Sequence, residues 1–421
     1  MSKVLIVDGG GRGHALAWAC RRADEIFVAP GNYGTNNFAH NVQNVPIAPD
    51  DVETLLEFAD QRSIGLTIAG QDTTVAHGIG DRFRQVGLKV LAPDKDAARL
   101  ETSKAFAKTF FQAEGIPTAP FQIADSYDEA MTICRTRTLP YVIKADGLAE
   151  GKGVFICRYE VDCAEILGRM LTDKEFGTAG EVVVIEDYLV GEELSVHVLC
   201  DGSNYLVLPT ARDYKSLNGI NTGGMGCFAP VPGIDEVLMA QIQQQIIVPT
   251  LKGLAKRGLH YVGCLYFGLM LTKQGPMLLE INARFGDPEA QVILPLLKTN
   301  FLTLANACVN GRLDKVRLSF RPGYTAGVVL ASAGYPIKCR IKDAKTIRGL
   351  SLIEQLHNVM VFHAGTRLIK DRIISQGGRV LIVVGTGKSL RQARKNAYKG
   401  VRLIHFQGMQ YLDNIAELAV V

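Results

Sequence analysis

Short apolar runs alternate with amphipathic stretches over the first hundred residues. The apolar runs occupy residues 3–11, 25–32, 65–70 and 87–93, and helical periodicity marks residues 14–23 and 51–62. Strands that are apolar throughout and separated by helices are typical of a parallel sheet with helices on both faces. Ligands of such sheets bind at the carboxyl ends of the strands, which here carry GGGRG, APGNYGT and AGQDTT.

The pattern changes after residue 100. A helical segment is stopped at Gly115 and Pro117, and apolar runs of antiparallel character follow. A helical stretch at 236–258 separates these runs from two further strand segments. From about residue 318, strands alternate with Gly/Pro turns, and the pattern ends on a helix at 389–404. The sequence therefore predicts a multidomain protein that combines an α/β domain with α+β domains.

Composition narrows the class of protein. The chain has 421 residues, of which 47% are hydrophobic and 21% charged, so we expect a soluble globular protein of two to four domains. Lys+Arg exceed Asp+Glu by 46 − 42 = 4, and no long basic block occurs, so nucleic acid is not the expected partner. No signal-peptide layout and no apolar run of membrane length is present, which predicts a cytoplasmic protein. The nine scattered cysteines form no CxxC pair and are expected to be buried and reduced.

A loop rich in glycine and lysine, KADGLAEGKG, joins two predicted strands at residues 144–153. Glycine lets backbone N–H groups approach phosphate oxygens, and lysine supplies positive charge. The loop differs from the Walker pattern, because Gly153 and not Ser or Thr follows Lys152. The segment is compatible both with a polyphosphate-binding loop and with an ordinary glycine-rich hairpin.

Two later segments supply carboxylates. The strand VVVIED delivers Glu186, suited to adenine, and Glu193 follows within reach of ribose hydroxyls; both are also compatible with surface acids. In LLEINARFGDPE, Glu280, Asn282 and Arg284 alternate on one strand face. A carboxylate and an amide oxygen can bind Mg²⁺ together with phosphates, and an arginine can steady a transferring phosphoryl group. A solvent-facing strand would show the same alternation.

In combination, these three segments resemble the active site of the ATP-grasp superfamily. The motifs GGRGHALAW, VAPGNYGT, SKAFAKTF, IKADGLAEGKGV, NTGGMG, LLEINARFGDPE, FHAGT and GGRVL occur in that order. They make nearly the whole chain similar to the glycinamide ribonucleotide synthetase (phosphoribosylamine–glycine ligase) family. The resemblance implies an N-terminal α/β substrate-binding domain at 1–102 and an ATP-grasp domain at 103–317 with a small mobile lid at about 118–190. A C-terminal mixed β/α domain would occupy 318–421.

The resemblance also implies an activity. The expected enzyme is an ATP-dependent carbon–nitrogen ligase of purine biosynthesis that requires Mg²⁺ or Mn²⁺. Glycine would be phosphorylated by ATP to glycyl phosphate, and the amine of 5-phosphoribosylamine would then displace phosphate. The protein is expected to be a monomer or weak homodimer, without nucleic acid or membrane partners.

Individual residues take roles from the same resemblance. ATP would contact Lys104, Lys144, Gly147, Gly151, Lys152, Gly153, Glu186, Tyr188, Leu189 and Glu193. The metal would be bound by Glu280 and Asn282, and the catalytic groups would be Arg284, Asp287, Asp213 and Lys215. The other substrates would meet Gly11, Gly31, Asn32, Gly34, Thr35, Gly223 and Gly224.

The chain departs from the family pattern at three places. GGRGHA has Gly13 where the family usually has an acid, AGQDTTV replaces GPEAPL, and ARDYKS replaces SQDHKR. Two of these lie where the phosphosugar amine is expected, although Asp72 could substitute for the missing glutamate. The alternative hypothesis is therefore a divergent ATP-grasp ligase that couples a small amino acid to a different amine.

Two other classes of protein fit less well. GGGRGHA lacks the dinucleotide fingerprint GxGxxG, because His14 stands at the third position, and the second strand does not end on an acid. A nucleotide-binding module without catalysis would be expected to lose metal or phosphate ligands, yet Lys144, Glu280 and Asn282 are all present.

Overall fold

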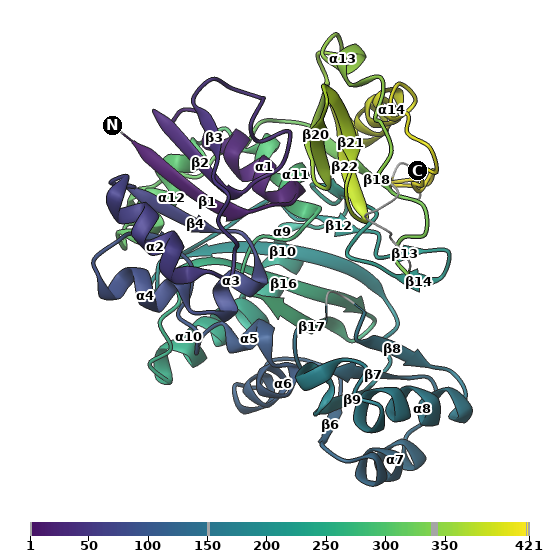
Figure 1. Cartoon of the computed structure of the whole chain (residues 1–421). Coiled ribbons are helices and arrows are strands. Elements are labelled where there is room, and N and C mark those ends of the chain that lie inside the picture. Colours follow the sequence, from purple (N-terminus) through teal and green to yellow (C-terminus); the bar gives the residue numbers. More distant parts are fainter. Residues whose placement is uncertain (1, 150–151, 338–343, 418, 420–421) are drawn as a thin grey trace.

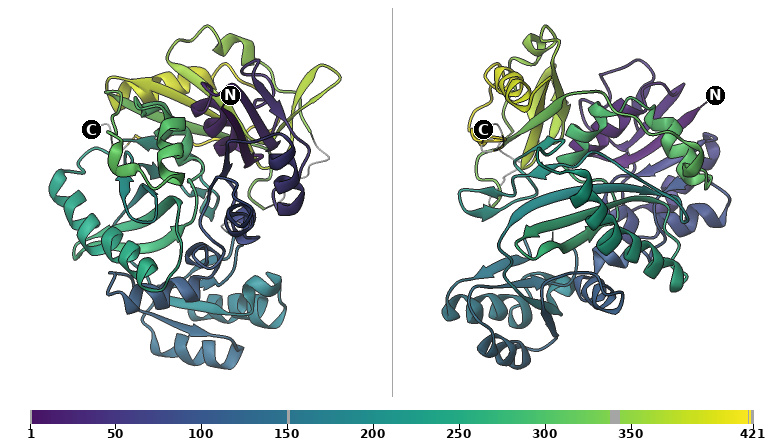
Figure 2. Two further views of the ribbon diagram at one scale, coloured as in Figure 1. Left: turned by 90° about the vertical axis from the view of Figure 1, so that its left-hand side faces the viewer. Right: turned by 180° about the vertical axis from the view of Figure 1, so that it is seen from behind.

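The computed structural model describes residues 2–149, 152–337, 344–417 and 419. Gly151, expected to contact ATP, and Cys339 lie outside these residues. Figure 1 shows an N-terminal sheet and a C-terminal sheet side by side above a central sheet, with a small α/β lid at the bottom. Figure 2 shows from two further sides that the lid joins the remainder of the molecule at one end only.

The N-terminal sheet is parallel, as the apolar runs predict. Its strand order is β3-β2-β1-β4-β5, and β1 is central because it pairs with both β2 and β4. The strands are β1 Lys3–Asp8, β2 Glu25–Pro30, β3 Val42–Asn44, β4 Leu66–Ala69 and β5 Val90–Leu91. The helices are α1 Gly11–Ala19, α2 Val52–Gln61, α3 Asp72–Ala76, α4 Ile79–Gln85 and α5 Arg99–Thr102.

The first helix differs from its prediction. The periodicity predicted a helix at 14–23, but α1 begins at Gly11, directly after the strand, and ends at Ala19. The early start has a local cause: the carboxylate of Asp8 accepts the backbone N–H of Gly10, which is the N-cap residue. The glycine turn is therefore short, and the first helical turn lies at the edge of the sheet.

The lid is a four-stranded antiparallel sheet covered by helices on one side (Figure 1). Its strand order is β6-β9-β7-β8. The glycine-rich loop connects the neighbouring antiparallel strands β7 and β8. The lid contains β6 Phe121–Ala124, α7 Tyr127–Thr136, β7 Tyr141–Ala145, β8 Val154–Cys157, α8 Glu160–Leu167 with a π-helical turn at Gly168–Thr172, a 3₁₀ turn at Gly177–Gly180, and β9 Val183–Asp187. Helix α6, Lys104–Ala113, precedes it.

The central sheet is antiparallel in the order β11-β10-β16-β17. Its strands are β10 Glu192–Cys200, β11 Tyr205–Val207, β16 Gly263–Thr272 and β17 Gly275–Asn282. The predicted helical stretch at 236–258 is α9 Glu236–Ile242, a π-helical turn at Gln243–Ile247, and α10 Val248–Lys256. The following helices are α11 Glu289–Ile293, a 3₁₀ turn at Leu294–Leu296, α12 Phe301–Val309 and a 3₁₀ turn at Leu313–Lys315.

The third large sheet mixes strands from distant parts of the chain. Its order is β12-β15-β18-β22-β19, so β15 pairs with β18 although about a hundred residues separate them. The strands are β12 Arg212–Asp213, β15 Gly226–Ala229, β18 Tyr324–Ala331, β19 Val359–His363 and β22 Arg379–Gly387. The hairpins β13 Ser216–Leu217/β14 Ile220–Asn221 and β20 Thr366–Ile369/β21 Arg372–Ser375 flank the sheet, with helices α13 Leu350–Ile353 and α14 Leu390–Val401.

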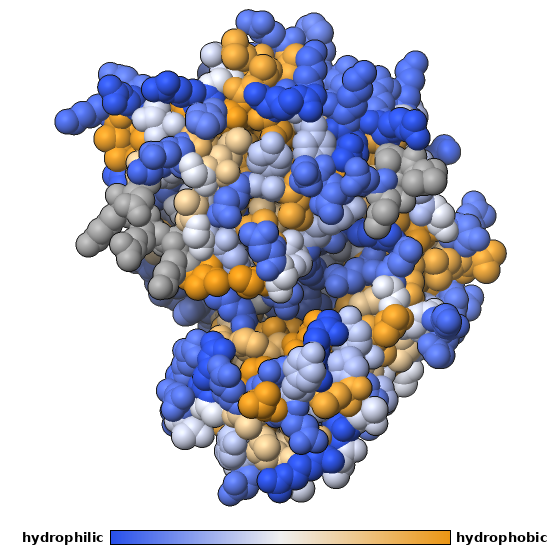
Figure 3. All heavy atoms as spheres, turned by 90° about the vertical axis from the view of Figure 1, so that its right-hand side faces the viewer, coloured by the Kyte–Doolittle hydropathy of each residue, from blue (hydrophilic) through white to orange (hydrophobic). Residues whose placement is uncertain are grey.

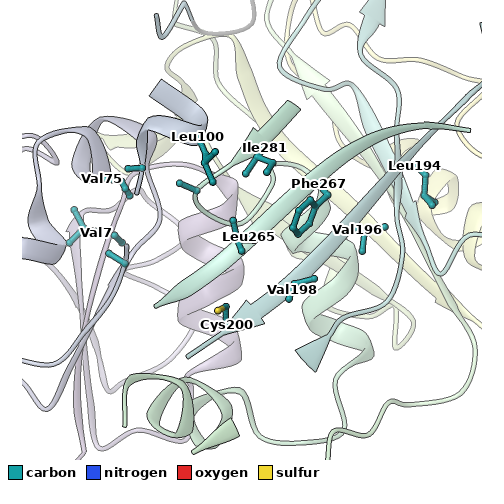
Figure 4. Close-up of a cluster of buried hydrophobic side chains, with 14 of the residues drawn as sticks. Val7, Val75, Leu100, Leu194, Val196, Val198, Cys200, Leu265, Phe267 and Ile281 are labelled. Carbon is teal, nitrogen blue, oxygen red and sulfur yellow. The ribbon is translucent and has the colours of Figure 1, made fainter. Parts of the chain in front are cut away.

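One apolar core runs between the N-terminal and central sheets. Figure 4 shows the row Leu194, Val196, Val198 and Cys200 of β10 beside Leu265 and Phe267 of the neighbouring strand β16, with Leu100, Val75 and Val7 on the side of the N-terminal sheet. The lid has a core of its own, built around buried residues such as Tyr141 and Ile185. The apolar residues of the lid are therefore buried separately from the main core, and movement of the lid stays a prediction.

Two expectations concern the chain as a whole. The eight cysteines within the described residues are buried and free, as expected for small apolar side chains. Within the same residues, no helix is long and apolar enough to cross a membrane.

Candidate active site

Glu186, at the end of β9, lies at the centre of a buried ion-pair cluster. Its carboxylate pairs with the ammonium of Lys144 on β7 at 2.5 Å and with that of Lys108 on α6. Burial would raise the pKa of Glu186, but the two ammonium groups hold it below its ordinary value. Both carboxylate oxygens are thus occupied by lysines, and contact of Glu186 with adenine stays a prediction.

The lysines of this cluster are held close to one another. Lys108 also donates to the hydroxyl of Thr118 at 2.6 Å, and burial lowers the pKa of Lys108 to about 8. Burial and the charge of Lys144 lower the pKa of Lys104, while Glu280 opposes them. Crowded ammonium groups in a desolvated place are a receptor for anionic oxygens, which would relieve their repulsion.

The start of α6 is tied to the glycine-rich loop. The side chain of Ser103 caps the helix by accepting the N–H of Phe106 at 3.1 Å, and its hydroxyl donates to Asp146 at 3.0 Å. The same carboxylate accepts the N–H of Ala105 at 2.6 Å, and Lys104 donates to the carbonyl of Gly147 at 3.0 Å. The first turn of α6 therefore fixes the first residues of the loop.

Glycine is required at two described positions of that loop. A Cβ at Gly147 would lie 2.7 Å from the Cβ of Ala179, and one at Gly153 would lie 2.8 Å from that of Ala149. The loop is thus closely packed at both ends, and Lys152 between them is exposed. Tyr188, which follows β9, is half-buried and lies 6.0 Å beneath the guanidinium of Arg158, and Leu189 is also half-buried.

Lys215 connects carboxylates on two strands of the central sheet, β10 and β17, that are separated by β16. Its ammonium lies 3.7 Å from Glu193 on β10 and 3.5 Å from Glu280 on β17. Burial would raise the pKa of Glu280, but Lys215, Lys144 and Lys104 together lower it to about 2. Glu280 is therefore ionised and lies within the field of the phosphate-side lysines, so the structure brings these predicted residues together.

The donor set fits a divalent cation that is also bound by phosphate. Glu280 supplies an ionised carboxylate, and Asn282, two residues on, supplies an amide oxygen that here accepts a 3.1 Å hydrogen bond from Arg284. Within the described residues, no group of three or more His, Cys, Asp or Glu side chains could hold a metal. A hard cation at these two oxygens would therefore need phosphate oxygens and water to complete its shell.

Arg284 is held by a carboxylate from the N-terminal part of the chain. Its guanidinium pairs with Glu101 on α5 at 2.8 Å, and the other oxygen of Glu101 accepts the N–H of Ala283 at 2.7 Å. Burial would lower the pKa of Arg284, but Glu101 and Asp72 raise it above its ordinary value. The charge of Asp72, in the divergent segment AGQDTTV, thus acts on the predicted catalytic arginine.

Asp287 lies where all three large sheets meet. Its carboxylate accepts the amide of Gln291 at 2.7 Å and lies 3.6 Å from the guanidinium of Arg379 on β22. Burial would raise the pKa of Asp287, but the guanidinium groups of Arg379 and Arg12 hold it below its ordinary value. Arg379 also donates to the carbonyl of Asp287 at 2.7 Å and to that of Gly223 at 2.5 Å.

Asp213 faces this group from β12. Burial and the nearby charge of Glu289 raise its pKa well above the ordinary value, and its Oδ1 is buried without a hydrogen-bond partner. A Cβ at Gly224 would lie 2.8 Å from this oxygen and 2.5 Å from Pro288, and the φ of Gly224 is +109°. Only glycine fits there, and the NTGGMG loop therefore reaches both Asp213 and the RFGDPE loop.

The predicted phosphosugar loop uses its side chains within the protein. The amide of Asn32 donates to the carbonyl of His363 at 2.8 Å, and the hydroxyl of Thr35 donates to Asn44 at 2.7 Å. A Cβ at Gly34 would lie 2.5 Å from the ring of His14, and the φ of Gly31 is +70°. Substrate binding by this loop therefore stays a prediction.

Gly11 follows Gly10, whose carbonyl accepts the side-chain amide of Asn32 at 3.3 Å. A Cβ at Gly11 would meet Ile382 at 2.5 Å and the amide of Gln291 at 2.7 Å. Gly11 therefore allows close packing of α1 against β22 and α11. Its predicted contact with substrate is not tested by this packing.

Sequence reasoning did not single out several residues that the structure places in the site. They are Asp8, Arg12, Glu101, Lys108 and Arg379. Arg12, Lys108 and Arg379 lie inside motifs that carried the resemblance, GGRGHA, SKAFAKTF and GGRVL. These three residues could therefore have been predicted from the motifs. Nothing near Asp8 or Glu101 in the sequence indicates which residues they pair with.

The parts of the site form one surface. Figure 3 shows the molecule hollowed between the lid, below, and the remainder, above. Cationic groups from α6 and β7 lie on the lid side, Glu280 and Asn282 on the central strand, and Arg284, Asp287 and Asp213 toward the other two sheets. The arrangement can neutralise a polyphosphate beside a carboxylate–amide pair, which is the electrostatic requirement of phosphoryl transfer.

Three family models match consecutive parts of the chain. The phosphoribosylglycinamide synthetase N domain matches residues 2–101, the ATP-grasp (A) domain residues 102–290, and the C domain residues 325–418.

Relatives are similar over nearly their whole length. The phosphoribosylamine–glycine ligase of Caldanaerobacter subterraneus subsp. tengcongensis is 43% identical, with 98% of this chain and 99% of the relative covered. That of Chlorobaculum tepidum is 42% identical, with 96% and 97% covered. The crystal structure of phosphoribosylamine–glycine ligase from Thermotoga maritima superposes with a TM-score of 0.84 at 33% identity, covering 98% of this chain and 100% of that one.

Proposed function

Because the chain belongs to the phosphoribosylglycinamide synthetase family, we propose that it joins glycine to 5-phosphoribosylamine in an ATP-dependent reaction of purine biosynthesis. An oxygen of the glycine carboxylate attacks the γ-phosphorus of ATP, the bond to ADP breaks, and glycyl phosphate forms. The amine of 5-phosphoribosylamine then attacks the acyl carbon. Phosphate leaves, the amine loses one proton, and the amide of glycinamide ribonucleotide remains.

The cationic surroundings of Glu280 carry this proposal. Lys104, Lys144 and Lys215 act on one ionised carboxylate at the mouth of a glycine-rich loop. The charge of Lys144 also lowers the pKa of Lys104, so the ammonium groups repel one another, which suits a triphosphate that brings negative charge between them. Phosphorylation converts a poor leaving group into a good one, and the protein contributes chiefly by holding the reactants in place.

We assign the predicted roles to residues as follows. Lys104 and Lys144 bind ATP phosphates, with the loop from Gly147 to Gly153 covering them. Glu186 binds adenine, with Tyr188 and Leu189 as further contacts of ATP, and Glu193 binds the ribose. Arg284 and Asp287 face the reacting groups. Asp213 and Lys215 belong to the same catalytic set, and the glycines of NTGGMG bring backbone N–H groups close to a substrate.

Glu280 and Asn282 would hold the divalent cation, Mg²⁺ or Mn²⁺. When bound, the cation neutralises charge on the transferring phosphate. In the protein without it, Arg284 donates to the oxygen of Asn282, so this arginine keeps the amide oriented. A further pairing of Arg284 with Glu101 restricts the guanidinium to that side of β17.

We also propose the wider setting of the enzyme. Residues 1–102 would bind phosphoribosylamine, 103–317 would bind ATP with a lid at about 118–190, and 318–421 would complete the site. The enzyme would act in the cytoplasm as a monomer or weak homodimer, without nucleic acid or membrane partners. The small excess of positive charge supports the absence of a nucleic-acid partner. Light scattering after size-exclusion chromatography measures the oligomeric state.

An ATP-consumption assay tests the activity. Purified protein receives MgATP and glycine with freshly made 5-phosphoribosylamine, and in parallel with other primary amines. Stoichiometric release of ADP and phosphate with the first pair is the expected result. Turnover with another amine and none with phosphoribosylamine would exclude the purine assignment, keep the ligase class, and favour the divergent ligase suggested by the altered segments.

A further inference from the structure

Asp8, the last residue of β1, is buried and has no role in the reaction described above. Its carboxylate makes two short hydrogen bonds. Oδ1 accepts the backbone N–H of Gly10 at 2.6 Å, and Oδ2 accepts the Nε–H of Arg12 at 2.6 Å. One carboxylate thus fixes both the glycine turn and the first side chain of α1 that carries a charge.

Arg12 connects Asp8 to the loop that contains Phe285 and Asp287. Its guanidinium donates to the carbonyl of Phe285 at 3.2 Å, and its charge helps to lower the pKa of the Asp287 carboxyl. Arg12 therefore contacts the RFGDPE loop through its side chain, and Gly10 lies against the same loop, since a Cβ there would be 3.3 Å from the carboxylate of Asp287. Because a guanidinium is rigid and planar, its direction depends on the group that holds Nε, and that group is Asp8.

The space around Asp8 excludes a side chain at position 13. A Cβ at Gly13 would lie 2.7 Å from the Cβ of Asp8 and 3.0 Å from its carbonyl oxygen. A Cβ at Gly70, at the end of β4, would lie 2.5 Å from Oδ2. The side chain of Asp8 therefore fits only because positions 13 and 70 are glycines. Position 13 is accordingly a glycine in GGRGHA.

These observations give Asp8 a task in the site. We propose that Asp8 is a positioning residue of the ligation, which holds Arg12 and Gly10 against Asp287 from β1, and that an acid at position 13 could take over this task only in exchange for the side chain at position 8. The inference rests on the proposed function, because Asp287 is placed there among the groups that face the reactants. An acid at 13 and a side chain at 8 exclude each other, so this chain can have only one of them.

Kinetics of Asp8→Asn test the positioning role. The amide keeps the size of the side chain but loses the charge that orients Arg12. We expect kcat/KM for phosphoribosylamine to fall at least about tenfold at a temperature where the variant is folded, with KM for ATP unchanged. The melting temperature is expected to fall, because the buried charge of Arg12 loses its partner. The matched control is Glu53→Gln, which removes the acid of an exposed ion pair with Arg82 in the same domain and is expected to leave all three unchanged.

The exchange is tested by a swap. Gly13→Glu alone is expected to lose activity and stability through the clash, whereas Asp8→Gly with Gly13→Glu is expected to regain most of both. If Asp8→Asn does not fold, the same cycle with Gly13→Ala in the wild-type and Asp8→Gly backgrounds measures the mutual exclusion through the free energy of unfolding.

Each outcome decides between the two ideas. A kcat/KM of Asp8→Asn within about threefold of wild type, or a loss accompanied by an equal rise in the KM for ATP, would overturn the positioning role. A folded swap variant that regains nothing, or additive effects in the cycle, would overturn the exchange. Absence of turnover by the wild-type enzyme with glycine and phosphoribosylamine would instead reject the proposed function.

Discussion

At the scale of residues, the site is governed by pairs of opposite charges. Glu186 holds two buried ammonium groups, and Glu280 lies among Lys215, Lys144 and Lys104. Each carboxylate is kept ionised by these neighbours, and the ammonium groups, which repel one another, are available to phosphate oxygens. The same charges that lower the pKa of Glu280 therefore prepare the place for a metal–nucleotide complex.

Removal of the charge at Glu280 tests the metal site. Glu280→Gln keeps the shape but loses the anionic ligand, so we expect kcat/KM to fall at least about 100-fold and the Mg²⁺ concentration for half-maximal rate to rise. Glu192→Gln is the matched control, because Glu192 is a neighbouring acid whose side chain is 70% exposed. Equal Mg²⁺ dependence in wild type and Glu280→Gln would contradict the assignment.

The pKa of Glu280 also predicts a dependence of stability on pH. Its folded pKa of about 2 lies below the ordinary 4.5, so the folded state binds the proton less readily than the unfolded state. The carboxylate therefore stabilises the fold above pH 4.5, and this contribution is lost as the pH falls toward 2. Urea unfolding at several pH values should show a steeper acid loss in wild type than in Glu280→Gln; parallel curves would disprove the shift.

At the scale of elements, local capping connects helix formation to the phosphate site. Ser103 caps α6 and also donates to Asp146, so one hydroxyl both starts the helix and anchors the glycine-rich loop. Lys104 follows directly and reaches Gly147. The position of the loop therefore depends on where α6 begins, which links helix geometry to nucleotide binding.

The N-caps of α6 and α14 allow the effect of a cap on protein stability to be separated from its effect on ATP binding. Ser103→Ala and Ser389→Ala each remove a hydroxyl that accepts a backbone N–H at a helix start, so each should cost about 1 kcal/mol of stability. Only Ser103→Ala also loses the bond to Asp146, and only this variant should raise the KM for ATP. Steady-state kinetics beside urea unfolding measure both quantities. A raised KM in both variants, or in neither, would argue against the anchor.

At the scale of the whole molecule, one arginine joins the C-terminal sheet to the site. Arg379 on β22 contacts carbonyls of Gly223 and Asp287 and the carboxylate of Asp287. The sheet that carries it also includes β12, which ends on Asp213. The C-terminal strands therefore complete a site whose other parts come from earlier in the chain, while the lid retains a separate core.

Arg379→Lys tests this connection. Lysine keeps the charge but cannot make the forked contacts, so we expect kcat/KM to fall about 10- to 100-fold with a nearly unchanged melting temperature. Arg367→Lys, at an exposed position on β20, is the matched control and should have no effect. An Arg379→Lys enzyme with wild-type kinetics would show that the three contacts serve packing alone.

Much of the local structure followed from the sequence. Apolar runs such as VLIVD and LTIA bury both faces of a strand, so a parallel sheet covered by helices was predictable from residues alone. The predicted helix at 14–23 was wrong at both ends, because the start of α1 depends on Asp8 accepting the N–H of its N-cap. Boundaries of this kind are decided by a side chain that lies outside the helix.

The sequence by itself determined the chemistry that is available and the order in which it occurs. Lysines beside glycines, and a carboxylate and an amide alternating before an arginine, are local patterns, and local spacing fixes which side chains share a strand face. Only the tertiary structure decided which groups meet. The pairing of Glu101 with Arg284, of Arg379 with Asp287, and of β15 with β18 joins residues more than ninety positions apart. Such contacts arise from packing of whole sheets, which no short stretch of sequence specifies.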